Sequence, residues 1–314
     1  MQQFRNILVG IQMPAGGRFS EQPFGEPTET AINQALELAS MCSARITFFA
    51  ALGASDWFEG ADEAAIDAEA KLVLDALVQR ADELEIEADG IVARGKAWLE
   101  LTRRVITGKH DVLVAGTRDK SAVSRLLYGS TGVKLLRYCP CPVWLVKPGE
   151  VPEIPLWLIA TDLAEVGLDC MMMGINGAQM FDPRVRVIHA VDHQLDRRMW
   201  HTGMSEEEVA EYRENTRAEA EAALHEQLSQ TDYRSLKYGV EPIIANGHPD
   251  ICVMQALEDE PTHLVIMGTC ARGGIPGMLL GNTAERLLPQ LNCSILALKP
   301  DDFVSPVKVE APAV

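Results

Sequence analysis

Apolar runs and helical patterns alternate along the chain, and the first half shows the alternation clearly. Apolar runs rich in Val, Ile and Phe lie at 5–11, 45–52, 111–116 and 142–147, with a weaker run at 85–93. Short buried runs of this kind predict β-strands. Helical patterning lies between them, at 28–42, 61–83, 97–107 and 121–138, and we expect the last of these to be interrupted at 129–132.

The second half repeats the same order of elements. Its predicted strands lie near 156–161, 185–191, 240–246, 263–268 and 294–299. Helical patterning covers 163–180 and 206–230, and the latter helix has Ser205 as its N-cap and Glu208 at the capping-box position. Strands that alternate with helices are joined by right-handed crossovers and form a mainly parallel sheet. The sequence therefore predicts an α/β fold of two tandem doubly wound, Rossmann-like domains, each a five-stranded parallel sheet flanked by helices.

Short sequences recur at a fixed spacing. The segment 141–148 (CPVWLVKP) resembles 293–300 (CSILALKP), at an offset of 152 residues. Gly116 and Gly268 share that offset, as do Gly129 and Gly281. Several matches at one offset indicate a duplicated domain. Because the three prolines within 148–155 suit an extended connector, the predicted first domain is 1–148, the linker 149–155 and the second domain 156–314.

Charge and composition narrow the range of partners. The chain has 314 residues and a formal net charge of −17. Nucleic-acid binding relies on clustered Lys and Arg that neutralise phosphates, so we expect no nucleic-acid partner. No apolar segment approaches the ~20 residues that span a bilayer, and no secretory signal is visible, so we expect a cytoplasmic protein without a membrane association. The seven cysteines, an odd number, are then expected to be free thiols.

A glycine motif follows the fourth predicted strand in both halves. The first half has Gly116-Thr-Arg-Asp119, nine further residues and then Gly129-Ser130, and the second has Gly268-Thr-Cys-Ala271, nine further residues and then Gly281-Asn282-Thr283. This spacing resembles the Gly-x2-Gly-x9-Gly-(Ser/Thr) motif of the universal stress protein family. The ending at 280–286, together with 298–301, resembles the tandem-domain, type E members of that family. The resemblance covers nearly the whole chain.

The resemblance implies a nucleotide site. In ATP-binding members the motif glycines and the hydroxyl hold the phosphates, because glycine lets backbone N–H groups approach phosphate oxygens. The second motif glycine is Asp119 in the first half, where a carboxylate would repel phosphates, and Ala271 in the second, where only a methyl is added. The aspartate that the family places at the end of strand one corresponds to Gln12 and Asp162.

The second half is therefore the better candidate for binding ATP or AMP, with Mg²⁺. The candidate site residues are Asp162, Gly268, Gly281, Asn282 and Thr283, and the first-half candidates are Gly116, Gly129 and Ser130. A structural interpretation of the same glycines stays open. In that interpretation two of them end a strand in a tight turn, and the other two bound a helix.

Other motifs resemble functional sites but lack required features. The segment 90–97 (GIVARGKA) nearly matches a phosphate-binding Walker loop, but its last residue lacks the magnesium-binding hydroxyl. His189 and His193 would lie about 13 Å apart if both were on a strand, so we interpret His189 as a strand-end residue and expect no metal site. Cys139 and Cys141 are interpreted as small buried thiols.

The sequence shows no nucleophile elbow and no paired-carboxylate or His–Cys arrangement, so we name no catalytic residue and expect no enzymatic activity. The resemblance implies a stress-response protein that acts by binding a ligand or a partner. Three alternatives stay open. One is a sensor that binds ATP or AMP in the second domain. Another is a carrier of an apolar metabolite there, because the methionines at 171–173 permit an adaptable apolar cavity. The third is a scaffold that binds only other proteins.

The fifth predicted strand of each half, at 142–146 and 294–298, is apolar and poorly protected by charge. Exposed edges of this kind invite pairing, and the resemblance implies that fifth strands pair with one another across two domains. We therefore expect these strands to pair within the chain, as an intramolecular pseudo-dimer with approximate two-fold symmetry. A homodimer of whole chains is also compatible with the sequence, which does not identify the protein or small-molecule partner.

Overall fold

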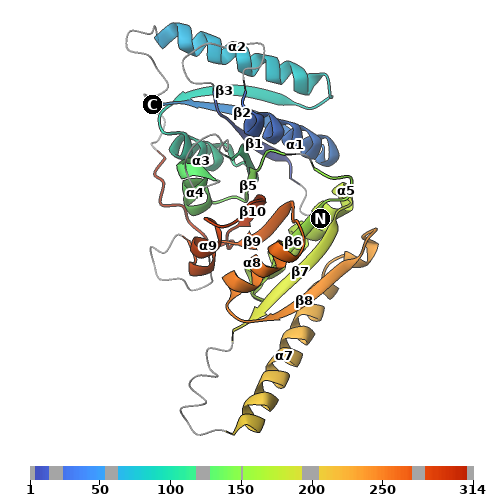
Figure 1. Ribbon diagram of the computed structural model, residues 1–314. Helices are drawn as coiled ribbons and strands as arrows, with labels where there is room; N and C mark the ends of the chain where they lie inside the picture. The colour runs from blue at the N-terminus through green and yellow to red at the C-terminus, as the bar shows by residue number, and fades with distance from the viewer. Residues whose placement is uncertain are drawn as a thin grey trace. The chain divides into compact units, whose positions relative to one another are not determined.

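The computed structural model of the chain describes residues 4–13, 24–53, 63–117, 128–149, 151–192, 205–270 and 280–309. The chain forms two compact units (Figure 1). The first consists of Met1–Glu150 together with Ser294–Val314, and the second of Val151–Cys293. The first unit thus includes the last strand of the second repeat, so the compact units differ from the predicted domains 1–148 and 156–314.

The first unit contains a sheet in the strand order β3-β2-β1-β4-β5-β10. Its strands are β1 (Asn6–Ile11), β2 (Arg45–Leu52), β3 (Ala88–Arg94), β4 (Val112–Gly116), β5 (Val143–Val146) and β10 (Ser294–Leu298). The five strands from the first repeat pair in parallel. Strands β1, β4 and β5 are short, apolar and almost wholly buried, and β2 is largely so, which explains why the sequence pattern predicts them. Strand β3 has no buried residue, which agrees with its weaker apolar pattern.

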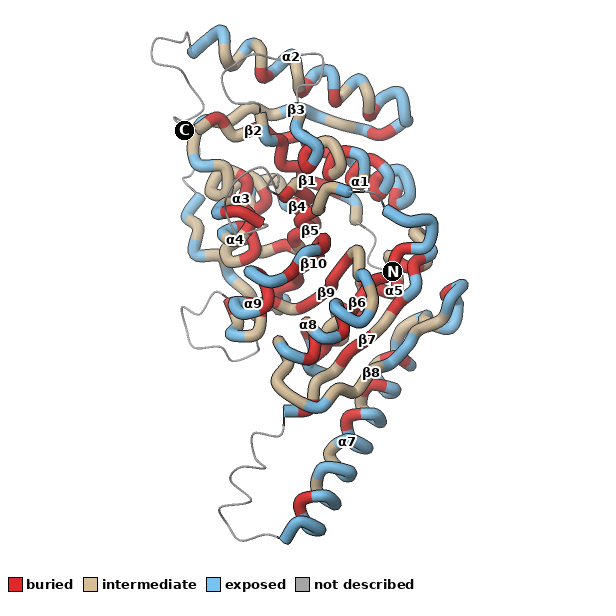
Figure 2. Tube along the Cα trace, in the orientation of Figure 1, coloured by how far each residue is buried: buried red, intermediate tan, exposed pale blue. Residues whose placement is uncertain are grey.

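Helices flank this sheet. They are α1 (Glu26–Cys42), α2 (Glu63–Asp82), α3 (Ala97–Gly108) and α4 (Gly129–Tyr138). Helix α1 has Pro27 in its first turn, where the missing N–H is not needed. It ends at Ser43, whose φ of 52° is left-handed and whose N–H donates to the Ala39 carbonyl. Burial follows one side of each helix, and the outer side of α2 is exposed (Figure 2).

The predicted interruption at 129–132 is wrong, because α4 is continuous from Gly129 to Tyr138. Gly129 has a φ of 61° and forms the start of the helix. A Cβ at Gly132 would lie 3.0 Å from Leu145 Cδ1, so this glycine lets α4 approach strand β5. The segment 121–127 lies outside the described residues.

The fifth strands of the two repeats pair in antiparallel fashion inside the first unit. Leu145 of β5 faces Ile295 of β10, and Trp144 faces Leu296. The Lys147 N–H also donates to Ser294 Oγ at 3.0 Å. This confirms the predicted pairing of the two apolar edge strands. The approximate two-fold symmetry stays a prediction.

The second unit contains four parallel strands in the order β9-β6-β7-β8. These strands are β6 (Leu156–Ala160), β7 (Arg184–Val191), β8 (Val240–Asn246) and β9 (Leu264–Gly268). Its helices are α5 (Glu165–Phe181), α7 (Glu206–Ser229), α8 (Pro249–Asp259) and α9 (Asn282–Leu287), with a short 3-10 helix at Tyr233–Ser235. The α/β class and the parallel pairing agree with the sequence prediction.

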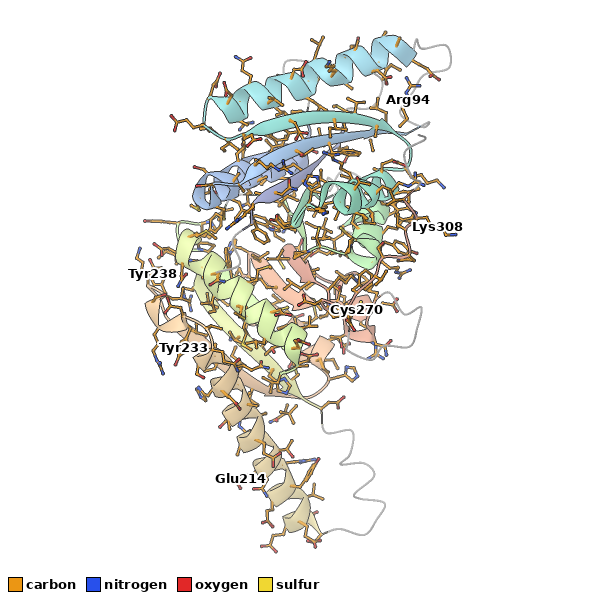
Figure 3. All side chains as sticks on the ribbon, turned by 180° about the vertical axis from the view of Figure 1, so that it is seen from behind. Arg94, Glu214, Tyr233, Tyr238, Cys270 and Lys308 are labelled. Atoms are coloured by element: carbon orange, nitrogen blue, oxygen red, sulfur yellow. The ribbon has the colours of Figure 1, made fainter. Side chains whose placement is uncertain are left out.

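Helix α7 begins as predicted. Ser205 Oγ accepts a hydrogen bond from the Glu208 N–H, and the Glu208 carboxylate accepts one from the Ser205 N–H, which completes the capping box. The Ser205 N–H, and after it the Ser205 hydroxyl, donate to the Glu208 carboxylate and lower the pKa of Glu208. The helix turns Leu224 and Leu228 inward, while Glu214, labelled in Figure 3, is exposed.

Candidate functional site

A cavity of about 370 Å³ lies in the second unit, at the carboxyl ends of strands β6, β7 and β9. Ligands of open parallel sheets bind at this edge, and cavities of roughly 300–1,000 Å³ are typical of small-molecule sites. The first turn of α5, the start of α8 and helix α9 complete the wall. Cys270, labelled in Figure 3, follows β9 and also lines the cavity.

The structure brings all of the second-half candidates together. The residues Asp162, Gly268, Gly281, Asn282 and Thr283 all line this cavity. They come from two segments more than 100 residues apart, which meet because β6 and β9 are neighbours in the sheet. Ala271, at the second motif position, lies outside the described residues.

The loop after β6 presents Asp162 to the cavity. Asp162 Oδ1 accepts a hydrogen bond from the Ala164 N–H at 3.0 Å, and Thr161 Oγ1 accepts one from the Leu163 N–H at 3.0 Å. These side-chain bonds fold the loop into tight turns. Leu163 has a φ of 60°, which is left-handed and rare for a leucine. The loop is therefore compact and strained next to the aspartate.

Gly167 is a residue of this site that sequence reasoning missed. A Cβ there would lie 2.2 Å from Thr161 Oγ1 and 2.8 Å from Asp162 Oδ1. The glycine thus lets the first turn of α5 close onto the loop that presents the aspartate. Gly167 belongs to no motif of the chain, so the sequence offered no signal for it.

The two motif glycines of this half have different surroundings. A Cβ at Gly268 would lie 2.7 Å from Val166 Cγ1, so packing against α5 needs a glycine at the end of β9. At Gly281 the nearest atom to a Cβ would be Thr269 O, at an ordinary contact distance of 3.4 Å. Gly281 also has an unstrained φ of −74°. Gly281 is the N-cap of α9, as the structural interpretation expected, although its backbone conformation and surroundings would also accept another residue.

His189 lies near the end of β7, as predicted, and it also lines the cavity. Its Nδ1 lies 3.0 Å from the Thr161 carbonyl oxygen. Because a carbonyl can only accept, Nδ1 carries the proton, and in the neutral ring the lone pair is on Nε2. His193 lies outside the described residues. The sequence indicated the position of His189 but not its place in the cavity wall.

Apolar side chains form much of the remaining wall. They include Val166, Ile188, Val253, Met267 and Leu287. The methionines that suggested an adaptable cavity are elsewhere, because Met171 is wholly buried in the core and Met172 is 42% exposed. The apolar part of the wall therefore comes from the strand ends and from helices α5, α8 and α9.

A polar network joins α8 to α9 beside the cavity. His248 Nδ1 donates to Asp250 Oδ1, and Arg286 Nη1 lies 3.2 Å from His248 Nε2. Since the guanidinium can only donate, Nε2 accepts, and this neutral tautomer satisfies both partners. Asp192 Oδ2 lies 4.0 Å from the same nitrogen. The network fixes helix α9, which carries Asn282 and Thr283, against the start of α8.

The first-half candidates do not line this cavity. A Cβ at Gly116 would lie 2.3 Å from the Pro27 carbonyl oxygen, so packing of α1 against β4 explains this glycine. Gly129 is buried at the start of α4, and Ser130 is exposed. Gln12 is also exposed, and Asp119 lies outside the described residues.

No disulfide joins the described cysteines to one another. Cys139 and Cys141 are buried, with their sulfurs 3.6 Å apart. Burial raises the pKa of the Cys141 thiol, and the neighbouring Cys139 adds to that effect. Among the described residues, no group of three His, Cys, Asp or Glu side chains could hold a metal ion. The described helices also include none that is long and apolar enough to cross a membrane.

Comparison with known proteins agrees with this architecture. The sequence profile of the universal stress protein family matches residues 3–147 and 158–299. Universal stress protein E of Photorhabdus laumondii is 27% identical over 227 residues, which cover 69% of this chain and 70% of that protein. Universal stress protein E of Escherichia coli K12 is 26% identical over 227 residues, with 70% of each chain covered.

Solved structures share the fold over nearly the whole chain. A putative universal stress protein from Pseudomonas aeruginosa has a TM-score of 0.68 at 20% identity, covering 96% of this chain and 95% of that one. A universal stress protein from Archaeoglobus fulgidus has a TM-score of 0.63 at 16% identity, covering 95% and 99%. With the profile matching both repeats, the chain belongs to the universal stress protein family and carries two tandem copies of its domain.

Proposed function

We propose that this protein acts in the stress response by binding a small ligand in the cavity of its second unit, without catalytic turnover. Membership of the universal stress protein family supports the role in stress response. The observation that carries the binding proposal is the gathering of five candidate residues, from two distant segments, around one cavity. An adenine nucleotide, ATP or AMP, is the ligand class that the motif resemblance favours.

The cavity offers groups suited to such a ligand. Asp162 uses Oδ1 to hold its own loop, and Oδ2 would accept hydrogen bonds from the ribose hydroxyls. The hydroxyl of Thr283 and the amide of Asn282 would donate to phosphate oxygens. Glycine at 281 leaves room for a phosphate to approach the backbone there. If Mg²⁺ accompanies the phosphates, it would arrive with the nucleotide.

Two titratable groups of the wall are held in fixed positions. Asp162 and His189 each use one polar atom for a hydrogen bond to a backbone group of the same loop, through Ala164 N and Thr161 O. Groups fixed in this way are suited to recognising a ligand of defined shape.

Equilibrium dialysis with labelled ATP and with labelled AMP, each with and without Mg²⁺, tests this proposal. We expect saturable binding of one nucleotide per chain. Asp162→Asn should weaken the affinity about tenfold, because it keeps the acceptor for Ala164 N but removes the charge that binds the hydroxyls. The control Asp182→Asn, an exposed carboxylate paired with Lys237 away from the cavity, should bind like the wild type. Absence of saturable binding of either nucleotide would exclude the nucleotide as ligand.

A second candidate ligand is an apolar metabolite. The observation that favours it is the apolar wall formed by residues such as Ile188, Met267 and Leu287. Native mass spectrometry of the purified protein distinguishes the two. A nucleotide mass on the chain supports the first candidate, and a co-purifying apolar compound supports the second.

A further inference from the structure

A side chain of helix α7 hydrogen-bonds to the loop that presents Asp162. Gln227 lies in the last turns of α7, between the buried residues Leu224 and Leu228. Its Nε2 donates to the Leu163 carbonyl at 2.9 Å and to the Ala164 carbonyl at 3.3 Å. A single amide group therefore holds two consecutive carbonyls of this loop.

The same loop contains the strained residue Leu163. A left-handed φ of 60° is costly for a leucine, because its Cβ approaches the backbone. Such strain persists only where the surroundings over-determine the conformation, and it collects at ligand sites. Here the surroundings are the bonds from Leu163 N and Ala164 N to side chains of the loop, and the bonds from Gln227 to the carbonyls.

Gln227 also has a feature that stability alone does not explain. Its Oε1 is buried and has no hydrogen-bond partner among the described residues. A buried acceptor without a partner destabilises a protein, whereas an apolar side chain of the same size would avoid that cost. Gln227 therefore lowers stability through its buried Oε1, and its Nε2 hydrogen-bonds to the loop beside the cavity.

We propose that Gln227 is a positioning residue of the cavity, through which helix α7 holds the loop that presents Asp162. Ligand binding and the docking of the last turns of α7 are then coupled, and linkage makes the coupling reciprocal. A ligand on Asp162 strengthens the contact of α7 with the loop, and a partner that displaces the end of α7 weakens the cavity. The coupling to a ligand rests on the proposed function, but the hold on the loop does not.

Hydrogen exchange of the Leu163 and Ala164 amides tests the proposal in the full-length chain. Both amides are hydrogen-bonded only while the loop keeps its turns. Gln227→Leu keeps the size but removes the donors, and it should speed exchange at these two amides about tenfold. Gln227→Lys restores N–H donors and should return exchange toward the wild-type rate. Gln179→Ala is the control, because Gln179 makes similar bonds to Asp232 and Ser235, away from the cavity.

A purely structural role makes a different pattern. If Gln227 only stabilised the unit, Gln227→Leu would lower the urea midpoint. It would also speed exchange of the β6 amides by the same factor as exchange of the Leu163 and Ala164 amides. That result would overturn the proposal. We expect a midpoint close to that of the wild type, because removal of the buried acceptor offsets the lost bonds to the two carbonyls, with unchanged β6 exchange. Wild-type exchange at Leu163 and Ala164 in Gln227→Leu, or equal acceleration in Gln227→Lys, would also overturn it.

Nucleotide affinity supplies the second measurement. Labelled ATP or AMP should bind Gln227→Leu several-fold more weakly than wild type, with Gln227→Lys in between. If the wild type binds neither nucleotide, the proposed nucleotide function fails, while the exchange data still decide whether Gln227 positions the loop. If nucleotide binds equally to all variants, the coupling is refuted and the proposed function stands.

Discussion

At the scale of single residues, the glycines of the cavity differ in what the fold demands of them. Gly167 and Gly268 have neighbours so close that a Cβ would overlap them, whereas Gly281 has ordinary space and an unstrained backbone. The first two are needed to build the cavity. Gly281 is the N-cap of α9, a position that glycine favours, and its open surroundings also leave room for a ligand to approach the backbone.

His110 provides a residue-scale prediction about pH. It is 5% exposed. Burial, with the charge of Arg104 adding to it, lowers the pKa of His110 to about 4. In the unfolded chain the pKa is about 6.5. Between these values the unfolded state takes up the proton, so stability falls as the pH falls from about 6.5 towards 4.

The substitution His110→Gln should remove this dependence. Urea unfolding at pH 7 and at pH 4.5 measures it, and the loss of stability between the two should be about 2 kcal/mol smaller in the variant than in the wild type. Asp111, whose pKa is raised by burial, titrates in both proteins and cancels from the comparison. Equal losses in the two proteins would mean that His110 takes up its proton in the folded state.

At the scale of elements, the long acidic helix α7 has its own start signal. The capping box of Ser205 and Glu208 fixes the first turn. Ser205→Ala should cost about 1 kcal/mol of unfolding free energy, since the Glu208 N–H loses its acceptor. The pKa of Glu208 is lowered first by the Ser205 N–H, which this variant keeps, and second by the Ser205 hydroxyl, which it loses, so the pKa should rise only part of the way towards its usual value.

Urea unfolding and an NMR titration of Glu208 measure these two effects. The control is Ser229→Ala at the other end of α7, where the hydroxyl donates only to the Glu226 carbonyl. It should leave the Glu208 titration unchanged. An unchanged pKa of Glu208 in Ser205→Ala would show that the Ser205 hydroxyl does not donate to the Glu208 carboxylate in solution.

Most elements could be predicted from the sequence, because buried parallel strands are short continuous apolar runs. Helix α8 was not predicted, since its buried positions Cys252, Val253 and Ala256 are small and make a weak pattern. The break expected at 129–132 was wrong for a related reason. Gly132 is explained by a contact with Leu145, which only the folded sheet provides.

Part of the cavity could also be predicted from the sequence. Its motif residues follow strand ends, and the carboxyl ends of neighbouring parallel strands meet at one edge. Gly167, His189 and Gln227 belong to no motif, and their roles depend on distances of a few ångströms in a loop. The spacing of residues along the chain does not reveal those distances.

At the scale of the whole molecule, the two sequence repeats do not coincide with the two compact units. Strand β10 comes from the second repeat but completes the compact unit of the first. Ile295 of β10 is fully buried there, opposite Leu145. Covering the apolar edge of β5 in this way also removes a site for unwanted strand pairing.

Ile295→Ala should therefore destabilise the first unit by about 2–5 kcal/mol, because the buried side chain leaves a cavity. The matched control is Val304→Ala in the same C-terminal segment, where an 84% exposed side chain should change stability by less than about 0.5 kcal/mol. Urea unfolding followed by hydrogen exchange of the β4 and β5 amides measures both. A loss confined to the amides of the second unit would contradict the assignment of β10 to the first.

The central claim is that the second unit binds its ligand at the edge where Asp162 and Thr283 line one cavity. A crystal structure of the chain grown with saturating AMP or a non-hydrolysable ATP analogue tests it most directly. We predict nucleotide density in that cavity, with the ribose beside Asp162 and a phosphate beside Gly281. Density only at another place on the molecule, or an empty cavity at saturating nucleotide, would contradict the claim.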